Sequence, residues 1–257
     1  MTIDLNCDLG EFSVKTNPGN DESVMAWITS ANIACGFHAG DPLTIEKTIR
    51  LALKHGVAIG AHPGYPDRDN FGRKNMDMPD EELRASLLYQ VGALKSMVET
   101  LGGKLRHVKP HGALYNKAAV NPGMAGLIVN TIREIDPALI VFGLSGSEMI
   151  LAAGKAGLAF ACEVFADRAY NEDGTLVPRS IPGALLHNPE QVILRAIRMV
   201  SEQRVETITG LTIPVRADTI CLHGDNENAA GLARELALAI REIGIALKPP
   251  GKFIAMH

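Results

Sequence analysis

Short apolar runs rich in β-branched residues recur along the chain, and the gaps between them leave room for helices. We predict strands at residues 3–7, 30–34, 57–61, 105–108, 139–143, 158–164 and 219–223. Strands that alternate with helices are typical of parallel β/α units. No shift in composition and no Pro- or Ser-rich linker interrupts the alternation, so we expect residues 1–257 to form a single domain.

The expected fold class is α/β, as a β/α barrel of seven or eight units. A doubly wound open sheet is the alternative, because a sequence does not show whether the last strand pairs with the first. Helix signals fill the gaps. Asp41-Pro42 and Asn188-Pro189 look like helix starts. Two apolar stripes predict helices, one through Leu83, Leu87, Val91, Leu94, Val98 and Leu101 and one through Ala229, Leu232, Leu236, Ala239 and Ile243.

Three segments do not fit the alternation: 63–78, 167–183 and 205–217. The first two follow strands and are rich in Gly, Asp and Arg, so we expect them to cover a pocket at the C-terminal ends of the strands. The third reads as a short hairpin around Thr209-Gly210.

Composition excludes several classes of protein. The chain carries 25 Lys and Arg against 29 Asp and Glu, a net charge of -4, without a basic run, so nucleic acid is not an expected partner. No apolar run approaches the roughly 20 residues that span a membrane, so no membrane partner is expected. The first residues lack the pattern of a secretory signal, and we expect a cytoplasmic protein. Cys7, Cys35, Cys162 and Cys221 form no C-x-x-C pair and are expected to be reduced, buried thiols.

Ionisable residues gather where the predicted strands end. Asp8 and Glu11 follow the first strand, His38 and Asp41 the second, His62 the third, Lys109 and His111 the fourth, Glu163, Asp167 and Arg168 the sixth, and His223 and Asp225 the seventh. A barrel or parallel sheet brings all of its strand C-terminal ends to one face. These residues are therefore expected to surround one pocket.

Strand parity refines this expectation, since residues two apart point the same way. Asn6 pairs with Asp8, and Lys109 pairs with His111. If that direction is the barrel interior, Lys109 and His111 reach one cavity, which places a cation beside a group that exchanges protons near neutral pH.

Asp8, His38 and His62 form a candidate set of divalent-metal ligands, because one carboxylate and two imidazoles are a common catalytic arrangement. Neither His38 nor His62 belongs to an H-x-x-x-H or H-E-x-x-H motif, so the presence of a tightly bound metal stays open. A P-loop is also absent from the sequence, so a nucleotide would bind in another manner.

Long motifs lie at these strand ends: Asn6-Cys-Asp-Leu-Gly-Glu11, Asn32-Ile-Ala-Cys-Gly-Phe-His-Ala-Gly-Asp41, Gly60-Ala-His-Pro-Gly-Tyr-Pro-Asp67, Val108-Lys-Pro-His-Gly-Ala-Leu-Tyr-Asn116, Glu163-Val-Phe-Ala-Asp-Arg-Ala-Tyr170, Leu176-Val-Pro-Arg179 and Cys221-Leu-His-Gly-Asp225. Over essentially the whole chain, these motifs resemble the LamB/YcsF family.

The resemblance implies a distorted TIM-like barrel related to the glycoside hydrolase and deacetylase group. It also implies ATP-dependent opening of 5-oxo-L-proline to L-glutamate, carried out with separate 5-oxoprolinase subunits B and C, with ATP and its Mg²⁺ as cofactors.

On that basis we assign Asp8 or Glu11 as base or Mg²⁺ ligand, and His38, His62 and His111 as proton-transfer groups. Lys109 and Arg168 become clamps for a phosphate or carboxylate. The other residues expected to bind substrate or phosphate are Asn6, Asp41, Glu163, Asp167, Arg179, His223 and Asp225.

Two other classes of function compete with this reading. A metal-dependent amide hydrolase or deacetylase without ATP is favoured by the carboxylate and histidine set. A subunit that binds a lactam or a carbohydrate and presents it to a catalytic partner is favoured by the family's need for other subunits.

Overall fold

The computed structural model describes residues 1–12, 21–223 and 229–251. Within these residues seven parallel strands close into a barrel, because β1 pairs with β2 on one side and with β9 on the other. In order around the barrel the strands are β1 (Thr2–Leu9), β2 (Ser30–Ala34), β3 (Ala58–His62), β4 (Leu105–Val108), β5 (Ile140–Leu144), β6 (Phe160–Phe165) and β9 (Thr219–His223). The expected barrel is thus confirmed, and the open-sheet alternative is excluded.

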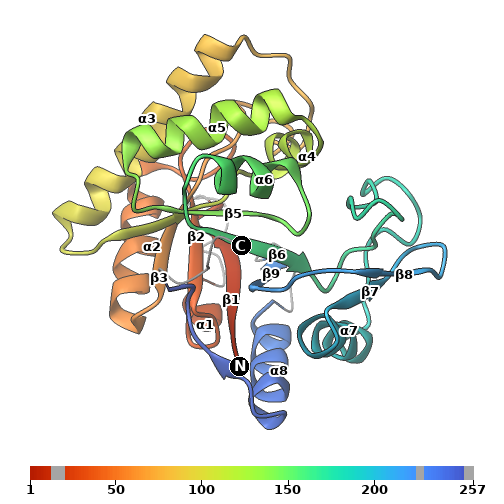
Figure 1. Cartoon of the computed structure of the whole chain (residues 1–257). Coiled ribbons are helices and arrows are strands. Elements are labelled where there is room, and N and C mark those ends of the chain that lie inside the picture. The colour runs from red at the N-terminus through yellow and green to blue at the C-terminus, as the bar shows by residue number, and fades with distance from the viewer. Residues whose placement is uncertain (13–20, 224–228, 252–257) are drawn as a thin grey trace.

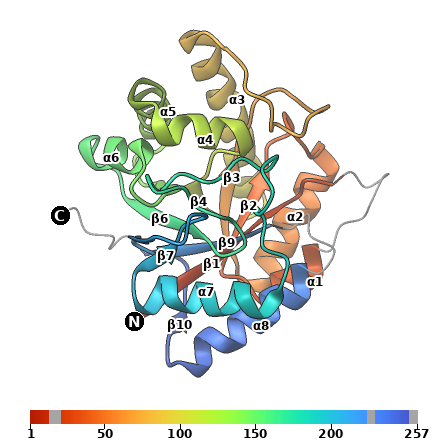
Figure 2. The same cartoon turned by 90° about the vertical axis from the view of Figure 1, so that its right-hand side faces the viewer.

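Helices surround these strands on the outside (Figures 1 and 2). They are α1 (Asp21–Met25), α2 (Pro42–His55), α3 (Asp80–Thr100), α4 (Gly112–Val120), α5 (Pro122–Ile135), α6 (Glu148–Lys155), α7 (Pro189–Ser201) and α8 (Ala229–Glu242). None of the described helices is long and apolar enough to cross a membrane.

The strand β1 shows how the sequence divides the two sides of the barrel wall. Its apolar residues Ile3, Leu5, Cys7 and Leu9 belong to the hydrophobic core between strands and helices. Of the alternate residues, Asp4, Asn6 and Asp8 are polar and buried, and they accept hydrogen bonds from side chains of the neighbouring strand β2. The interior of the barrel at this strand is therefore a polar network, as parity predicted for Asn6 and Asp8.

A glycine in β3 makes room for part of that network. A Cβ atom at Gly60 would lie 2.0 Å from Nε2 of His107, so the imidazole occupies the space that any larger residue would fill. That ring stacks on Phe142 with centroids 4.1 Å apart and lies 2.8 Å from Oδ1 of Asn32. The close approach fixes the residue type at position 60.

Helix starts follow the predicted capping chemistry. Asp41 accepts a hydrogen bond from the Thr44 amide at 2.9 Å, and Asn188 accepts one from the Gln191 amide at 3.1 Å. Each helix then begins at the following proline, which suits the first helical turn. In α3 the predicted apolar stripe is buried from Leu83 to Val98.

Several details differ from the prediction. Three predicted strands begin one or two residues early, and the short strand β10 (Ala246–Leu247), which pairs with the start of β1, was not predicted. The hairpin is confirmed as β7 (Arg204–Glu206) and β8 (Thr212–Pro214). The prediction that Ile243 continues the apolar stripe of α8 is wrong, because α8 ends at Glu242 and Ile243 is 44% exposed.

Candidate active site

A pocket of about 460 Å³ opens at the C-terminal ends of the barrel strands. Asp8, His62 and Phe165 reach it from the ends of β1, β3 and β6, and residues 109–113 reach it from the loop after β4 and the start of α4. Residues of the 63–78 and 167–183 segments complete its wall: Arg73, Asn75, Arg168, Leu176, Pro178, Arg179 and Ser180. Both segments therefore border the pocket, as their composition predicted.

Lys109 is the buried cation of this site. Its Nζ atom donates to Oδ1 of Asp8 at 2.8 Å and lies 2.9 Å from Oε1 of Glu163. Burial alone would lower the pKa of Lys109, but the negative charges of Asp8 and Glu163 raise this pKa well above its usual value. Lys109 therefore stays protonated throughout the physiological range.

A layer of hydrogen bonds beneath Lys109 holds these groups in place. Asn32 donates to Oδ1 of Asp8 at 2.8 Å, and Asn6 donates to Oε1 of Glu163 at 3.0 Å. The Tyr115 hydroxyl, from α4, donates to the other Glu163 oxygen at 2.7 Å. The Asp8 and Glu163 carboxylates that pair with Lys109 are thus each held by other side chains as well. The ammonium group of Lys109 is therefore preorganised.

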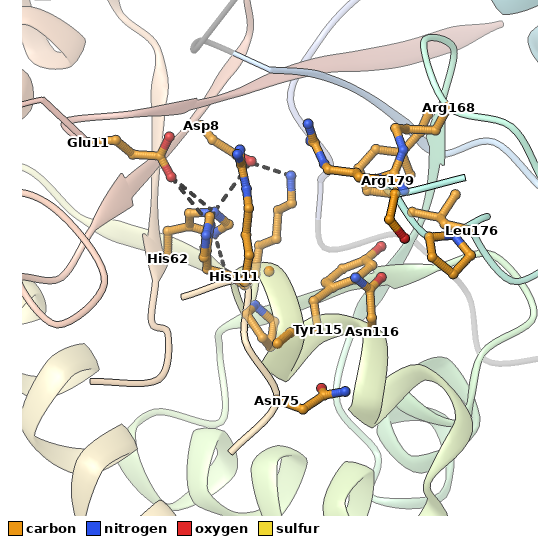
Figure 3. Close-up of a pocket in the computed structure, with 18 residues that line it drawn as sticks. Asp8, Glu11, His62, Asn75, His111, Tyr115, Asn116, Arg168, Leu176 and Arg179 are labelled. Atoms are coloured by element: carbon orange, nitrogen blue, oxygen red, sulfur yellow. Dashed lines mark hydrogen bonds and ion pairs between the residues drawn. The ribbon is translucent and has the colours of Figure 1, made fainter. Parts of the chain in front are cut away.

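Glu11, His38, His62 and His111 form a second group, in which one possible ligand atom from each residue lies within 4.8 Å of the others. Oε1 of Glu11 lies 3.2 Å from Nε2 of His38 and 3.3 Å from Nδ1 of His111. Nε2 of His62 lies 3.4 Å from Oδ2 of Asp8, which joins this group to the Lys109 network. Figure 3 shows Glu11, His62 and His111 turned toward one another on one side of the pocket.

Burial controls the charge of two of these imidazoles. Loss of water lowers the pKa of His38 and of His111 well below its usual value, and the neighbouring histidines lower both further. Neutral imidazoles have a free lone pair. Together with Glu11, these residues are a donor set that suits a divalent transition-metal ion.

Arg168 and Arg179 lie on the opposite side of the pocket (Figure 3). Arg168 donates one guanidinium N–H to the Val177 carbonyl at 2.7 Å, while its buried Nε atom finds no hydrogen-bond partner within the described part of the chain. Burial and the charge of Arg179 lower the pKa of Arg168 to about 10, so the side chain remains charged at neutral pH. Two guanidinium groups side by side favour an anion between or beside them.

Not every predicted residue reaches the pocket. Asp41 caps α2 with one carboxylate oxygen and accepts from the Thr44 hydroxyl with the other, so its polar atoms are engaged in a helix start. Asp167 begins the 167–183 segment and is not part of the pocket lining. The backbone of His223 pairs with that of Asp8, and the His223 side chain and Asp225 lie outside the described residues.

Of the proposed metal ligands, His38 and His62 belong to the four-residue group, whereas Asp8 stands beside it. The prediction left Glu11 and His111 out of its divalent-metal set, although it named Glu11 separately as a possible Mg²⁺ ligand. It also gave no role to Asn32, His107 and Tyr115. Strand parity could have identified His107, because it lies two residues before Lys109 and points the same way. Asn32 pairs with Asp8 in the register of β1 and β2.

The four cysteines are free and buried, as predicted. Burial raises the pKa of Cys35 and of Cys162 to about 12, and it raises those of Cys7 and Cys221 well above the usual range. These thiols stay protonated near neutral pH, so they are poor nucleophiles.

A closed β/α barrel with a pocket of paired carboxylates, a buried lysine and histidines at the strand C-terminal ends is the architecture of a barrel enzyme. The chain belongs to the LamB/YcsF family, whose model matches residues 3–255.

Similar proteins cover nearly the full length. The chain is 51% identical to the A subunit of a 5-oxoprolinase from Brevibacillus brevis, over 96% of this chain and 97% of the relative. The crystal structure of a lactam utilization protein from Thermus thermophilus shares the fold with a TM-score of 0.90 and 44% identity, covering 96% of this chain and 99% of that one. A family 4 carbohydrate esterase from Streptomyces lividans, at 11% identity, TM-score 0.51 and coverage of 98% and 94%, shares the fold alone.

Proposed function

We propose that this chain opens the lactam ring of 5-oxo-L-proline to give L-glutamate, in an ATP-dependent reaction carried out with partner subunits of the B and C kind. The observation that carries the proposal is the pocket itself: a lysine fixed between carboxylates lies across from two arginines. The names of the similar proteins, lactam utilization protein and 5-oxoprolinase A subunit, supply the substrate class and the expectation of a complex.

The substrate has two features that the pocket can distinguish. Its carboxylate is an anion, and Arg168 with Arg179 offers it charge-assisted hydrogen bonds. Its amide carbonyl gains negative charge when a nucleophile attacks, and the ammonium group of Lys109 is placed to stabilise that charge. The pocket volume of about 460 Å³ lies in the range of small-molecule sites.

The reaction breaks the ring C–N bond. Water adds a hydroxyl to the carbonyl carbon, and a proton goes to the leaving nitrogen, which becomes the amine of glutamate. Asp8 or Glu11 is suited to accept the proton of the water, and the histidines beside them are suited to return one to the nitrogen. An amide is a poor electrophile, and ATP, with Mg²⁺, would activate it by transferring its terminal phosphoryl group to the amide oxygen and releasing ADP. Water would then add to the carbon, the C–N bond would break as the nitrogen takes up a proton, and a second water would hydrolyse the resulting acyl phosphate to the carboxylate and phosphate.

The second candidate function is metal-dependent hydrolysis of an amide without ATP. The group of Glu11 and three histidines favours it, because such donors hold the ions that activate water in hydrolases. The two candidates differ in what they require, since the first needs ATP and the second needs its metal ion but no nucleotide.

The deciding experiment measures glutamate formed from 5-oxoproline with and without ATP and Mg²⁺, by this chain alone and after mixing with its partner subunits. Glutamate formed by the assembled complex and dependent on ATP would support the first proposal. Glutamate formed without ATP and abolished by a chelator would favour the second. If a verified complex forms none under either condition, lactam opening is wrong for this chain; a role limited to binding then predicts that 5-oxoproline still binds and that pocket substitutions weaken the binding.

A further inference from the structure

The imidazoles of His62 and His111 have their tautomers set by backbone carbonyls. Nδ1 of His62 lies 2.7 Å from the Lys109 carbonyl oxygen, and Nε2 of His111 lies 2.8 Å from the Phe71 carbonyl oxygen. A carbonyl oxygen only accepts, so each of these ring nitrogens must carry the hydrogen. In the neutral form of either imidazole, the other nitrogen presents a lone pair.

Those two lone pairs face each other. Nδ1 of His111 lies 2.9 Å from Nε2 of His62, and neither ring has a second N–H to place between them unless it takes up a proton. Two acceptors at this distance repel, so the arrangement calls for a cation between or beside them. The carboxylate of Glu11 adds a third donor, with Oε1 at 3.3 Å from the His111 nitrogen and 3.9 Å from the His62 nitrogen.

We infer that His62 Nε2, His111 Nδ1 and Glu11 Oε1 hold one divalent transition-metal ion of the Zn²⁺ class, with the remaining coordination position open toward the pocket. Donors bound at about 2.0–2.1 Å to one tetrahedral ion stand about 3.3 Å apart. The three separations here, 2.9, 3.3 and 3.9 Å, lie around that value. Two imidazoles with one carboxylate suit Zn²⁺ better than Mg²⁺, which prefers oxygen ligands.

His38 differs from the other two imidazoles and is inferred to be a positioning residue. Its ring is stacked on that of His111, 3.8 Å apart and 3° from parallel, so in-plane lone pairs of the two rings do not converge on a common ion. It does not line the pocket, and its Nδ1 atom has no hydrogen-bond partner among the residues that the structure describes. Its Nε2–H is placed to donate to Glu11 at 3.2 Å, which orients the carboxylate.

The surroundings hold the three donors in this geometry. Metal-binding histidines commonly donate their outer N–H to a backbone carbonyl, as His62 and His111 do here. Phe71, whose carbonyl accepts from His111, has φ of 56°, a strained value for a residue with a side chain. The chain thus maintains a costly backbone conformation where it positions the acceptor for one donor ring.

The test is metal binding by the full-length protein, measured apart from catalysis. Protein stripped with a chelator is titrated with Zn²⁺ and, separately, with Co²⁺, with stoichiometry from elemental analysis and coordination from the Co²⁺ visible spectrum. We expect one equivalent and a spectrum of low coordination number. Glu11→Gln and His111→Ala should weaken binding by more than about 100-fold, and His38→Ala by about 10- to 100-fold without changing stoichiometry. His187→Ala, at an exposed position, is the matched control and should bind as the unaltered protein does.

The inference is overturned if the unaltered protein binds no stoichiometric ion. A proton shared by His62 and His111 would then account for their close approach. A loss in His38→Ala equal to that in His111→Ala would overturn the assigned ligand set. If a variant does not fold, ¹⁵N spectra of the unaltered protein decide: Zn²⁺ must shift the inner nitrogens of His62 and His111 rather than those of other histidines. This site does not depend on whether ring opening needs ATP, so failure here leaves the ATP-dependent proposal standing and counts against the metal-dependent candidate.

Discussion

Nζ of Lys109, which follows β4, lies 2.8 Å from Oδ1 of Asp8 in β1, so an ion pair spans the interior of the barrel between strands that are not neighbours. Glu163 in β6 binds the same ammonium group at 2.9 Å. All three side chains are buried, and burying a charge is costly unless it is paired and hydrogen-bonded. The ion pair therefore matters for stability as well as for the site, because replacing one of its members leaves a buried charge without a partner.

Replacing Lys109 by Met should destabilise the protein and stop ring opening. Two buried carboxylates would lose their shared cation, which costs about 3–5 kcal/mol of the free energy of unfolding. Loss of a group that stabilises developing negative charge should lower kcat by at least about 100-fold. Urea denaturation and a glutamate assay measure the two effects. Lys155→Met, at an exposed position on α6, is the control and should change stability by less than about 0.5 kcal/mol. Equal stability of the two variants would contradict the structural role.

Arg179 should contribute to substrate binding more than to the chemical step. A charge-assisted hydrogen bond is worth about 1.5–3 kcal/mol, so Arg179→Ala should raise KM for 5-oxoproline by about 10- to 100-fold with kcat little changed. Arg179 is a cleaner target than Arg168, whose guanidinium also holds the Val177 carbonyl. Arg198→Ala, exposed on α7 away from this pocket, is the control. A fall in kcat at unchanged KM would show that Arg179 does not bind the ground-state carboxylate.

His107 should make the protein less stable in acid. Burial and the charge of Lys109 lower the pKa of His107 from 6.5 to about 3 in the folded state. Between these values the unfolded chain binds a proton that the folded protein does not, so this contribution is complete above pH 6.5 and is lost as the pH falls toward 3. From pH 7 to pH 5 the loss is about 2 kcal/mol.

Urea denaturation at pH 7, 6 and 5 tests this by comparing the unaltered protein with His107→Gln. The variant should lose about 2 kcal/mol less over that range, whatever its stability at pH 7. Asp4 acts in the opposite direction, because burial raises its pKa to about 6 and the folded state then binds the extra proton. Asp4 is present in both proteins, so the difference between them isolates His107. Identical pH dependence of the two proteins would show that this imidazole is not buried as a neutral base.

The sequence predicted the parts of the fold that follow from local patterns. The alternation of apolar runs and helix signals identified the barrel units, and parity placed Asn6 and Asp8 on the inner face and brought Lys109 and His111 to one pocket. These predictions succeeded because strand periodicity and the parallel arrangement of β/α units fix side-chain direction without knowledge of the loops.

The positions of the loop residues could not be predicted from the sequence. Asp41 and Glu11 both follow a strand near glycines, yet Asp41 turns to cap a helix while Glu11 turns toward three histidines. Nothing in their spacing separates the two outcomes, because each depends on how a loop folds back over the barrel. The two-residue strand β10 is missed for a related reason: it is too short for a periodic pattern and is defined by its pairing with β1.

Gly72 tests how closely the 63–78 segment packs on the histidines. Its φ is +64°, and a Cβ atom there would lie 2.8 Å from Cβ of His38 and 2.9 Å from Cδ2 of His111. Gly102 is a matched control, with φ of +82° and open space around it. Each change to Ala should cost about 1–2 kcal/mol from the left-handed backbone. Gly72→Ala should cost a further 1–3 kcal/mol, roughly, because Cβ of His38 and the ring of His111 must move.

The two variants should also differ in function. Displacing His111 changes its position relative to Glu11 and His62, so Gly72→Ala should lower glutamate formation by the assembled complex, whereas Gly102→Ala should leave it unchanged once folding is accounted for. Denaturation curves and activity measured on the same preparations separate backbone strain from displacement of the rings. If both variants lose the same stability and activity, displacing the histidine rings has no effect. The 63–78 segment would then not be needed to hold the histidines in place.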